Sequence, residues 1–170
     1  AKLVLGARRE EHLRKLVDEI VQAGGEAVYH VTDVTKIEDN NKLVELAKEK
    51  FGRVDVIFLN AGVMPNSPLS KLKTKDWHLM VDVNIKGVLN GIEAVLPEFT
   101  KQKSGHVITT SSVAGLKAYP GGAVYGATKW AVRDLMEVLR MESAMEGTNI
   151  RTATIYPAAI NTELLETIND

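Results

Sequence analysis

Hydrophobic positions along this chain follow two alternating patterns. Short apolar runs with few charges predict buried strands at residues 2–6, 27–31, 54–59, 105–111 and 150–156. Between them, apolar side chains recur three or four positions apart, as at Leu13, Leu16 and Ile20. This spacing predicts helices over 9–23, 37–51, 75–101 and 123–145. Glycines that end helices follow the first two, at 24–25 and 52.

The alternation of strands and helices predicts an α/β fold with a doubly wound parallel sheet. Apolar strands suit a sheet that is buried on both faces, so helices should cover both sides in three layers, α/β/α. Such a sheet places the carboxyl ends of its strands on one edge, where these folds bind ligands. We expect a single domain over residues 1–170.

Composition narrows the class of function. The 170 residues include 21 basic and 22 acidic side chains, and a net charge of -1 argues against a nucleic-acid binder. No apolar run is long enough to cross a membrane, so no membrane partner is expected. The absence of cysteine removes disulfides and fits a reducing, cytoplasmic location. The 4 histidines lack metal-binding spacing, so no metal site is expected.

Tyr125 and Lys129 are four positions apart on a predicted helix and therefore share one face. An ammonium group held near a phenol favours the phenolate, which would lower the pKa of Tyr125 toward working pH. A tyrosine in that state can act as a general acid or base. Taken alone, the spacing is more often that of a half-buried tyrosine beside an exposed lysine.

Three further polar signals lie at or near strand ends. Ser112 follows the strand 105–111 and can donate to a substrate oxygen, or it can cap its own turn, as Ser111 could. Asn60-Ala61-Gly62 follows the strand 54–59, where small residues admit a flat ligand or form an ordinary turn. Asn84 lies inside the predicted helix 75–101, where asparagine is unfavourable. It therefore indicates either a local break in the helix or a polar side chain with a function inside the protein, such as holding a water.

These motifs, in this order and spacing, closely resemble those of the short-chain dehydrogenases/reductases. The matching motifs are Asn60-Ala61-Gly62, Asn84-x-x-Gly87, Ser112, Tyr125-x-x-x-Lys129, Asp33-Val34-Thr35 and Pro157-x-x-x-x-Thr162. The resemblance extends over the whole chain and implies a Rossmann-like fold that binds a nicotinamide dinucleotide.

The resemblance also implies a role for each catalytic position. Tyr125 would exchange a proton with the substrate oxygen, and Ser112 would orient the substrate carbonyl. Lys129 would lower the pKa of Tyr125 and bind the nicotinamide ribose. Asn84 would hold a water in the proton relay, with its main chain slightly broken from the helix.

Cofactor contacts are implied for residues that follow the strands. Asp33 would meet the adenine amino group with Val34 beside it, and Asn60-Ala61-Gly62 would pass under the adenosine ribose. Along the segment that begins at Pro157, Ile160 and Thr162 would contact the nicotinamide carboxamide.

The sequence departs from the family pattern in two respects. The family's glycine-rich phosphate loop, first strand and first helix have no counterpart, and family members continue further, so we expect a domain incomplete at both ends. The first strand is central in the family's sheet, so the strand 2–6 should lack a partner on one side. Ala158 stands where the family usually has glycine, which affects the local cofactor contact.

The residues after the strand 2–6 indicate the choice of cofactor. An acidic residue there binds the ribose 2′-hydroxyl of NAD, whereas arginine accommodates a 2′-phosphate. Ala7 stands where NAD-using relatives have aspartate, and Arg8 and Arg9 follow it. We therefore expect NADP(H) rather than NAD(H), with Arg8 as the primary contact and Arg9 assisting. Alternatively, both arginines are solvated at a helix start, where cations are unfavourable.

The favoured function is that of an NADP(H)-dependent oxidoreductase that interconverts a carbonyl and a secondary alcohol on a small molecule. An epimerase or dehydratase of the same family and a non-catalytic nucleotide-binding or interaction protein are the alternatives. Segments 64–70 and 113–122 would flank the substrate in a partly apolar pocket. The resemblance implies a homodimer or homotetramer that pairs through helices 75–101 and 123–145.

Overall fold

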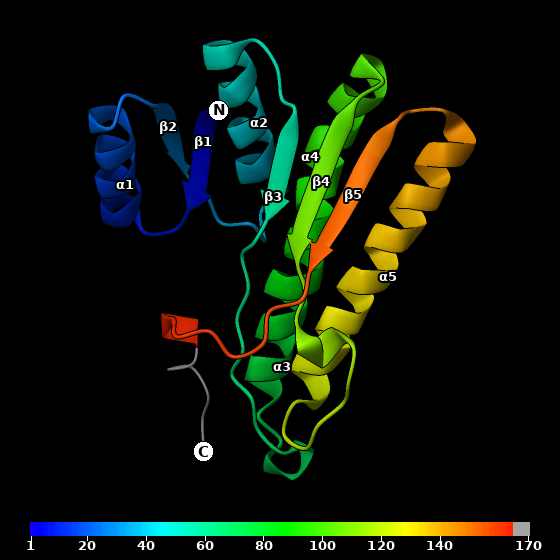
Figure 1. Ribbon diagram of the computed structural model, residues 1–170. Helices are drawn as coiled ribbons and strands as arrows, with labels where there is room; N and C mark the ends of the chain where they lie inside the picture. The colour runs from blue at the N-terminus through cyan, green and yellow to red at the C-terminus, as the bar shows by residue number, and fades with distance from the viewer. Residues whose placement is uncertain (165–170) are drawn as a thin grey trace.

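Strands and helices alternate along the chain as predicted (Figure 1). The computed structural model describes residues 1–164, and residues 165–170 of the expected domain lie outside this part. The described strands are β1 (Lys2–Ala7), β2 (Glu26–Val31), β3 (Val56–Leu59), β4 (Gly105–Thr110) and β5 (Ile150–Ile155). The helices are α1 (Glu10–Gln22), α2 (Ile37–Phe51), α3 (Thr74–Val81), α4 (Gly87–Gln102) and α5 (Ala123–Glu146). Short turns are η1 (Leu69–Lys71), η2 (Asp82–Lys86) and η3 (Val113–Gly115).

The strands pair in parallel, but in two separate groups. β1 pairs with β2, and β3, β4 and β5 lie side by side in that order. Within residues 1–164 no ladder joins β1 to β3. The facing edges of β1 and β3 border a large cavity. The expectation that strand 2–6 lacks a partner on one side is therefore confirmed.

One face of the three-stranded sheet carries the main hydrophobic core. Val107 of β4 and Ile150 of β5 are buried against Phe99 of α4 and against Val132 and Met136 of α5. The ring of Phe99 lies directly over Gly105, where any side chain would overlap it. Truncating a fully buried phenylalanine costs about 3–5 kcal/mol, so this contact fixes α4 on the sheet.

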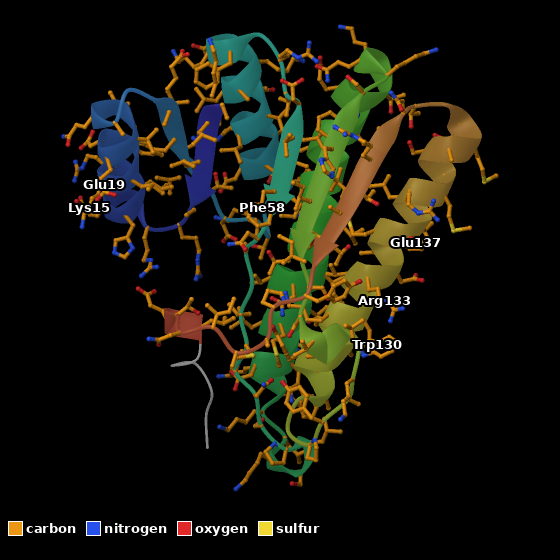
Figure 2. All side chains as sticks on the ribbon, in the orientation of Figure 1. Lys15, Glu19, Phe58, Trp130, Arg133 and Glu137 are labelled. Atoms are coloured by element: carbon orange, nitrogen blue, oxygen red, sulfur yellow. The ribbon has the colours of Figure 1, made fainter. Side chains whose placement is uncertain are left out.

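The opposite face of the three-stranded sheet is more open. Side chains alternate along β3, so Ile57 and Leu59 point toward Gly91 of α4 while Val56 and Phe58 point away and are exposed (Figure 2). Among the described residues, helices therefore cover only one face of this sheet. The β1–β2 sheet, by contrast, lies between α1 and α2, which both pack on it (Figure 1).

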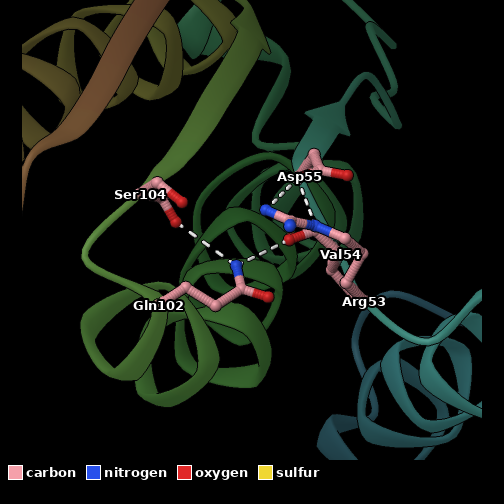
Figure 3. A network of polar contacts seen from close by, with 5 residues as sticks. All are labelled: Arg53, Val54, Asp55, Gln102 and Ser104. Carbon is pink, nitrogen blue, oxygen red and sulfur yellow. Dashed lines mark hydrogen bonds and ion pairs between the residues drawn. The ribbon is translucent and has the colours of Figure 1, made fainter.

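A side chain at the end of α4 ties the starts of two strands together (Figure 3). The side-chain amide of Gln102 donates from Nε2 to the carbonyl of Val54 at 2.9 Å and to that of Ser104 at 3.3 Å. Beside it, Arg53 Nε donates to Asp55 Oδ1 at 2.8 Å. Because β3 begins just after Val54 and β4 just after Ser104, this network sets where both strands start.

Side-chain contacts through α2 and α4 connect the two sheets. Lys48 of α2 forms an ion pair with Glu98 of α4 at 2.8 Å. Asn90 of α4 donates from Nδ2 to the carbonyl of Val34, in the loop after β2, at 2.8 Å. These contacts hold the β1–β2 unit beside the rest of the structure.

Candidate active site

The predicted site residues converge on one cavity of about 2440 Å³. It lies between β1 and β3 and extends past the carboxyl ends of the strands. All predicted site residues except Asn84 line it, namely Arg8, Arg9, Asp33, Val34, Asn60, Ala61, Gly62, Ser112, Tyr125, Lys129, Pro157, Ile160 and Thr162. The sequence therefore identified residues that share one cavity although they are widely separated along the chain.

Tyr125 and Ser112 meet where β4 ends and α5 begins. Tyr125 lies in the first turn of α5 and is 5% exposed. The Ser112 hydroxyl lies close enough to the Tyr125 phenol to lower its pKa. Ser112 Oγ also accepts from the Ala114 amide at 3.1 Å and so caps η3. The capping role of Ser112 is therefore confirmed, and because an oxygen that accepts one N–H keeps its own proton, the hydroxyl still has a proton to donate.

Lys129 follows Tyr125 one helical turn later and points back toward the end of β4. It is 4% exposed, and its Nζ donates to the Thr110 carbonyl at 2.8 Å. Burial disfavours the charged amine and lowers the pKa of Lys129 to about 8. The reading of Lys129 as an exposed partner is therefore wrong, since this amine is held inside the site.

The expected direction of the Tyr125 pKa is wrong for this structure. Burial of the phenol raises the pKa of Tyr125, and the nearby Ser112 hydroxyl only opposes that shift. The Lys129 ammonium lies 5.6 Å from the centroid of the Tyr125 ring and is directed to Thr110 instead of to the phenol oxygen. Desolvation therefore outweighs the stabilisation that the sequence spacing suggested.

Asn84 marks a real break in the predicted helix 75–101. Residues Asp82–Lys86 form a π-helical turn between α3 and α4, as a helix-interior asparagine had indicated. The buried side chain of Asn84 accepts a hydrogen bond from the Val63 amide and donates one to the Val63 carbonyl, both at 2.9 Å. It also donates to Thr128 Oγ1 at 3.1 Å, and Thr128 in turn donates to the Tyr125 carbonyl at 2.7 Å.

The segment Asn60-Ala61-Gly62 leaves β3 alongside these groups. Thr110 Oγ1 donates to Asn60 Oδ1 at 2.8 Å and joins the ends of β3 and β4. A Cβ placed on Gly62 would lie 3.6 Å from Lys129 Nζ and 3.5 Å from Asn84 Oδ1. The absence of a side chain at Gly62 therefore leaves the backbone open next to the buried lysine.

Asp33 and Val34 form an ordered turn after β2. Asp33 Oδ1 accepts from the Thr35 amide at 3.0 Å and from the Thr35 hydroxyl at 2.8 Å. The hydroxyl hydrogen bond is the main cause that lowers the pKa of Asp33, followed by that of the amide. The Val34 carbonyl accepts from Asn40 at 3.1 Å and from Asn90 at 2.8 Å. This loop is thus held in position from both α2 and α4.

The two arginines after β1 differ in their contacts. Arg8 lies near enough to Asp33 for its charge to contribute to lowering that carboxyl pKa. Arg9 forms an exposed ion pair with Glu163 at 2.9 Å. Glu163 was not among the sequence candidates, and the pair joins the start of α1 to the segment that follows β5.

The segment after β5 closes another side of the cavity. The Val113 amide donates to the Pro157 carbonyl at 3.0 Å, which binds this segment to the end of β4. Ile160 and Thr162 follow as exposed lining residues. Ala158, which stands in place of the expected glycine, also lines the cavity.

Two structural roles near the site were missed by sequence reasoning. Ser111 donates to the Lys129 carbonyl at 2.9 Å and so ties β4 to α5 beside the reactive groups. Thr128 links Asn84 to Tyr125, as described above. One indication of each role was present in the sequence: Ser111 is adjacent to the candidate Ser112, and Thr128 is adjacent to the candidate Lys129.

Within residues 1–164 no group of three or more histidine, cysteine, aspartate or glutamate side chains is arranged to hold a metal ion. In the same part of the chain, no helix has the length and apolar character that crossing a membrane requires.

Comparisons with known proteins agree with this geometry. A sequence model described as short chain dehydrogenase matches residues 1–170. An uncharacterized oxidoreductase of Listeria innocua is 77% identical over 170 residues, which are 100% of this chain and 68% of the relative. The crystal structure of a short chain dehydrogenase/reductase from Burkholderia phymatum in complex with NAD superposes with a TM-score of 0.94. Its identity is 33%, over 98% of this chain and 59% of that one.

A gluconate 5-dehydrogenase from Burkholderia cenocepacia, in complex with NADP and tartrate, gives a TM-score of 0.89 at 30% identity. The match covers 96% of this chain and 64% of that chain. The chain therefore belongs to the short-chain dehydrogenase family of oxidoreductases and has its Rossmann-like α/β fold. It spans about two thirds of the length of the Listeria relative. Solved relatives bind NAD in one case and NADP in the other.

Proposed function

We propose that this protein is an NADP(H)-dependent oxidoreductase that interconverts a carbonyl and a secondary alcohol. Residues 1–170 would act as one dinucleotide-binding and catalytic domain. The observation that carries the proposal is the buried Tyr125, whose phenol lies beside Ser112 and one helical turn from the buried Lys129 amine. A phenol, a hydroxyl and an amine at one cavity wall are suited to proton exchange with a substrate oxygen.

A nicotinamide dinucleotide fits the residues that line the cavity. Gly62 leaves open backbone beside Lys129, so the dinucleotide would approach the main chain closely there. Asp33 and Val34 form a fixed turn at the other side, and Arg8 supplies positive charge next to it. The residues that would hold the cofactor are Arg8, Arg9, Asp33, Val34, Asn60, Ala61, Gly62, Tyr125, Lys129, Pro157, Ile160 and Thr162.

The bound cofactor would supply or accept the hydride. Ser112 would donate a hydrogen bond to the substrate carbonyl oxygen and orient it toward Tyr125. During reduction, the Tyr125 hydroxyl would give its proton to that oxygen, and during oxidation the phenolate would take it back. Because the pKa of Tyr125 is raised in the protein alone, its protonated form dominates near neutral pH, which favours its use as an acid.

Lys129 would stabilise the phenolate that forms when Tyr125 gives up its proton. With a pKa of about 8, its amine is mostly protonated near neutral pH and provides the positive charge. Asn84 would hold the relay water through its main chain at the π-helical turn, because its side chain is engaged with Val63 and Thr128. Its side chain would act as a positioning group for the loop after β3.

The preference for NADP(H) rests on the arginines after β1. Arg8 would contact the 2′-phosphate, since a guanidinium binds phosphate with two parallel hydrogen bonds. Arg9 would assist only when it is released from Glu163. Ala7 provides no carboxylate to accept from a ribose 2′-hydroxyl at this position.

We further propose that the protein is a cytoplasmic homodimer or homotetramer. Apolar side chains remain exposed on α5, including Val138, Met141 and Met145. Trp130 is also exposed on this helix, with the Arg133 guanidinium 5.4 Å from its ring centroid (Figure 2). Apolar groups gathered on one helix support an interface between subunits.

A fluorescence titration with NADPH and NADH, followed by a ketone-reduction assay, tests the proposed function. NADPH should bind at least ten times more tightly than NADH and support reduction of a carbonyl to an alcohol. A preference for NADH would overturn the assignment of Arg8 but keep the oxidoreductase class. If the protein binds neither coenzyme, the proposed function is wrong.

A further inference from the structure

Two buried polar atoms in the loop after β3 have no partner in the protein. Asn66 and Ser67 are 9% and 8% exposed, and both line the cavity that contains Ser112 and Tyr125. Neither Asn66 Oδ1 nor Ser67 Oγ forms a hydrogen bond. Buried side-chain polar atoms are nearly always paired, so an adjacent pair of exceptions in a cavity wall indicates a binding function.

The Asn66 side chain is held in place by the rest of the loop. Its Nδ2 donates to the Tyr119 hydroxyl at 2.8 Å, and its main-chain amide donates to the Met64 carbonyl at 2.8 Å. The Tyr119 ring packs over Gly122, where any side chain would overlap it. With Nδ2 occupied by Tyr119, Oδ1 is left as the free hydrogen-bond acceptor.

This pair of atoms is close to the reacting groups. Tyr119, the partner of Asn66, is near enough to Tyr125 for their phenol groups to interact electrostatically. The loop that carries Asn66 and Ser67 is also fixed three residues earlier by the two hydrogen bonds between Asn84 and Val63. The free atoms are therefore part of an ordered wall beside Tyr125.

We propose that Asn66 and Ser67 recognise a hydroxyl group of the substrate, next to the carbonyl that reacts. Asn66 Oδ1 would accept the proton of that hydroxyl, and Ser67 Oγ would donate to its oxygen. The substrate would then be a hydroxy ketone or its polyol product instead of a purely apolar carbonyl compound. This inference rests on the proposed oxidoreductase function and names the substrate class of the same site.

The chemistry of buried hydrogen-bonding groups sets the expected discrimination. A site built to pair with a substrate hydroxyl rejects an analogue that lacks it, because the polar groups of the protein then stay unpaired. The pocket is thus polar at Asn66 and Ser67, although its neighbours Met64 and Pro65 are buried. These two residues add polar groups to the partly apolar pocket expected from the sequence.

The test compares 2-butanone, which has no hydroxyl group, with 1-hydroxy-2-butanone and 4-hydroxy-2-butanone, which each carry one at a different position. The purified protein should reduce at least one hydroxylated ketone with a kcat/KM at least ten times that for 2-butanone. In Asn66→Leu and in Ser67→Ala, this ratio should fall to about a third of its value or less, mainly through KM. Ser70→Ala, an exposed serine of the same segment, should keep the full ratio.

Three results would overturn the inference in distinguishable ways. Equal kcat/KM for all three ketones in the unaltered protein would show that the two atoms bind no substrate hydroxyl, while the oxidoreductase function would stand. A preference for the hydroxylated ketones that persists in both Asn66→Leu and Ser67→Ala would place the recognition of the hydroxyl elsewhere. Failure to reduce any of these ketones with either coenzyme would count against the proposed function itself. If Asn66→Leu does not fold, Ser67→Ala and Tyr119→Phe carry the same comparison.

Discussion

Asn84 and Val63 are joined by two hydrogen bonds that pair a side-chain amide with a main-chain amide and carbonyl. Asn84 Oδ1 accepts from the Val63 N–H, and Asn84 Nδ2 donates to the Val63 carbonyl, both at 2.9 Å. The same Nδ2 also donates to Thr128 on α5. The loop after β3 and the helix that carries Tyr125 are therefore positioned by one side chain.

Replacing Asn84 with alanine should destabilise the fold. Asn84→Ala leaves the Val63 amide and carbonyl without these partners, and each buried unpaired group costs about 1–3 kcal/mol. We expect the free energy of unfolding, measured by urea denaturation, to fall by about 2–4 kcal/mol. Asn41→Ala, on the exposed side of α2, is the matched control and should change it by less than about 0.5 kcal/mol. A loss no larger in Asn84→Ala than in the control would contradict this role.

Removing the Tyr125 hydroxyl should stop turnover but leave cofactor binding nearly intact. Tyr125→Phe keeps the ring and loses only the group that exchanges the proton. General acid–base catalysis contributes about 10²–10⁴-fold, so we expect kcat to fall by at least that range. The dissociation constant for NADPH, from fluorescence titration, should change by less than about threefold. Full activity in Tyr125→Phe would remove this residue from the mechanism.

Burial of Lys129 should make the stability of the fold depend on pH in the alkaline range. The pKa of this amine is near its ordinary value of 10.5 when the chain is unfolded and about 8 when it is folded. Between these values the unfolded state binds more protons, so this contribution makes stability increase with pH. Below pH 8 both states are protonated and the burial penalty is present in full.

Lys129→Met isolates this contribution. The free energy of unfolding of the variant should exceed that of the unaltered protein by the largest margin below pH 8. This difference should shrink by up to about 3 kcal/mol as the pH rises toward 10.5. Urea denaturation at pH 7, 8, 9 and 10 measures it. Lys15→Met, on the exposed side of α1, should show no such trend (Figure 2). A margin for Lys129→Met that is constant with pH would be inconsistent with a depressed pKa.

Breaking the ion pair between Arg9 and Glu163 should strengthen NADPH binding specifically. Glu163→Gln removes a negative charge near the proposed 2′-phosphate position and releases the Arg9 guanidinium. We expect NADPH to bind about two to five times more tightly, with less effect at high salt, and NADH to be unchanged. The exposed pair contributes only about 0–1 kcal/mol, so the fold should be unaffected.

Arg8→Ala provides the opposite comparison for the same titration. It should weaken NADPH binding by at least tenfold and leave NADH binding unchanged, because only NADPH carries the phosphate. If either variant changed the dissociation constants for NADPH and NADH by the same factor, these arginines would not contact the 2′-phosphate.

The sequence was most informative where the physical signal is local or periodic. The strands and helices followed from apolar spacing, and Asn84 indicated the π-helical turn because asparagine is unfavourable inside a helix. Tyr125 and Ser112 were brought together because the parallel topology directs both to one sheet edge. The positions of residues at strand ends and on helix faces could thus be predicted from the sequence pattern.

Contacts between distant loops could not be predicted in this way. Asn66 and Tyr119 are 53 residues apart in segments without periodicity, so nothing in the sequence pairs them. Arg9 and Glu163 are charged and exposed, which is typical of any surface position. The direction of the Tyr125 pKa depends on how completely the phenol is buried, and that follows from packing of the whole site.

The candidate cofactor contacts are distributed over two groups of strands. Side-chain contacts such as Lys48–Glu98 and Asn90–Val34 connect the β1–β2 unit to the unit that contains β3, β4 and β5. Arg8 and Asp33 lie on one unit, whereas Tyr125 and Lys129 lie on the other. A dinucleotide that contacted both units would connect the residues of one to those of the other, and slower amide hydrogen exchange at α2 would accompany its binding.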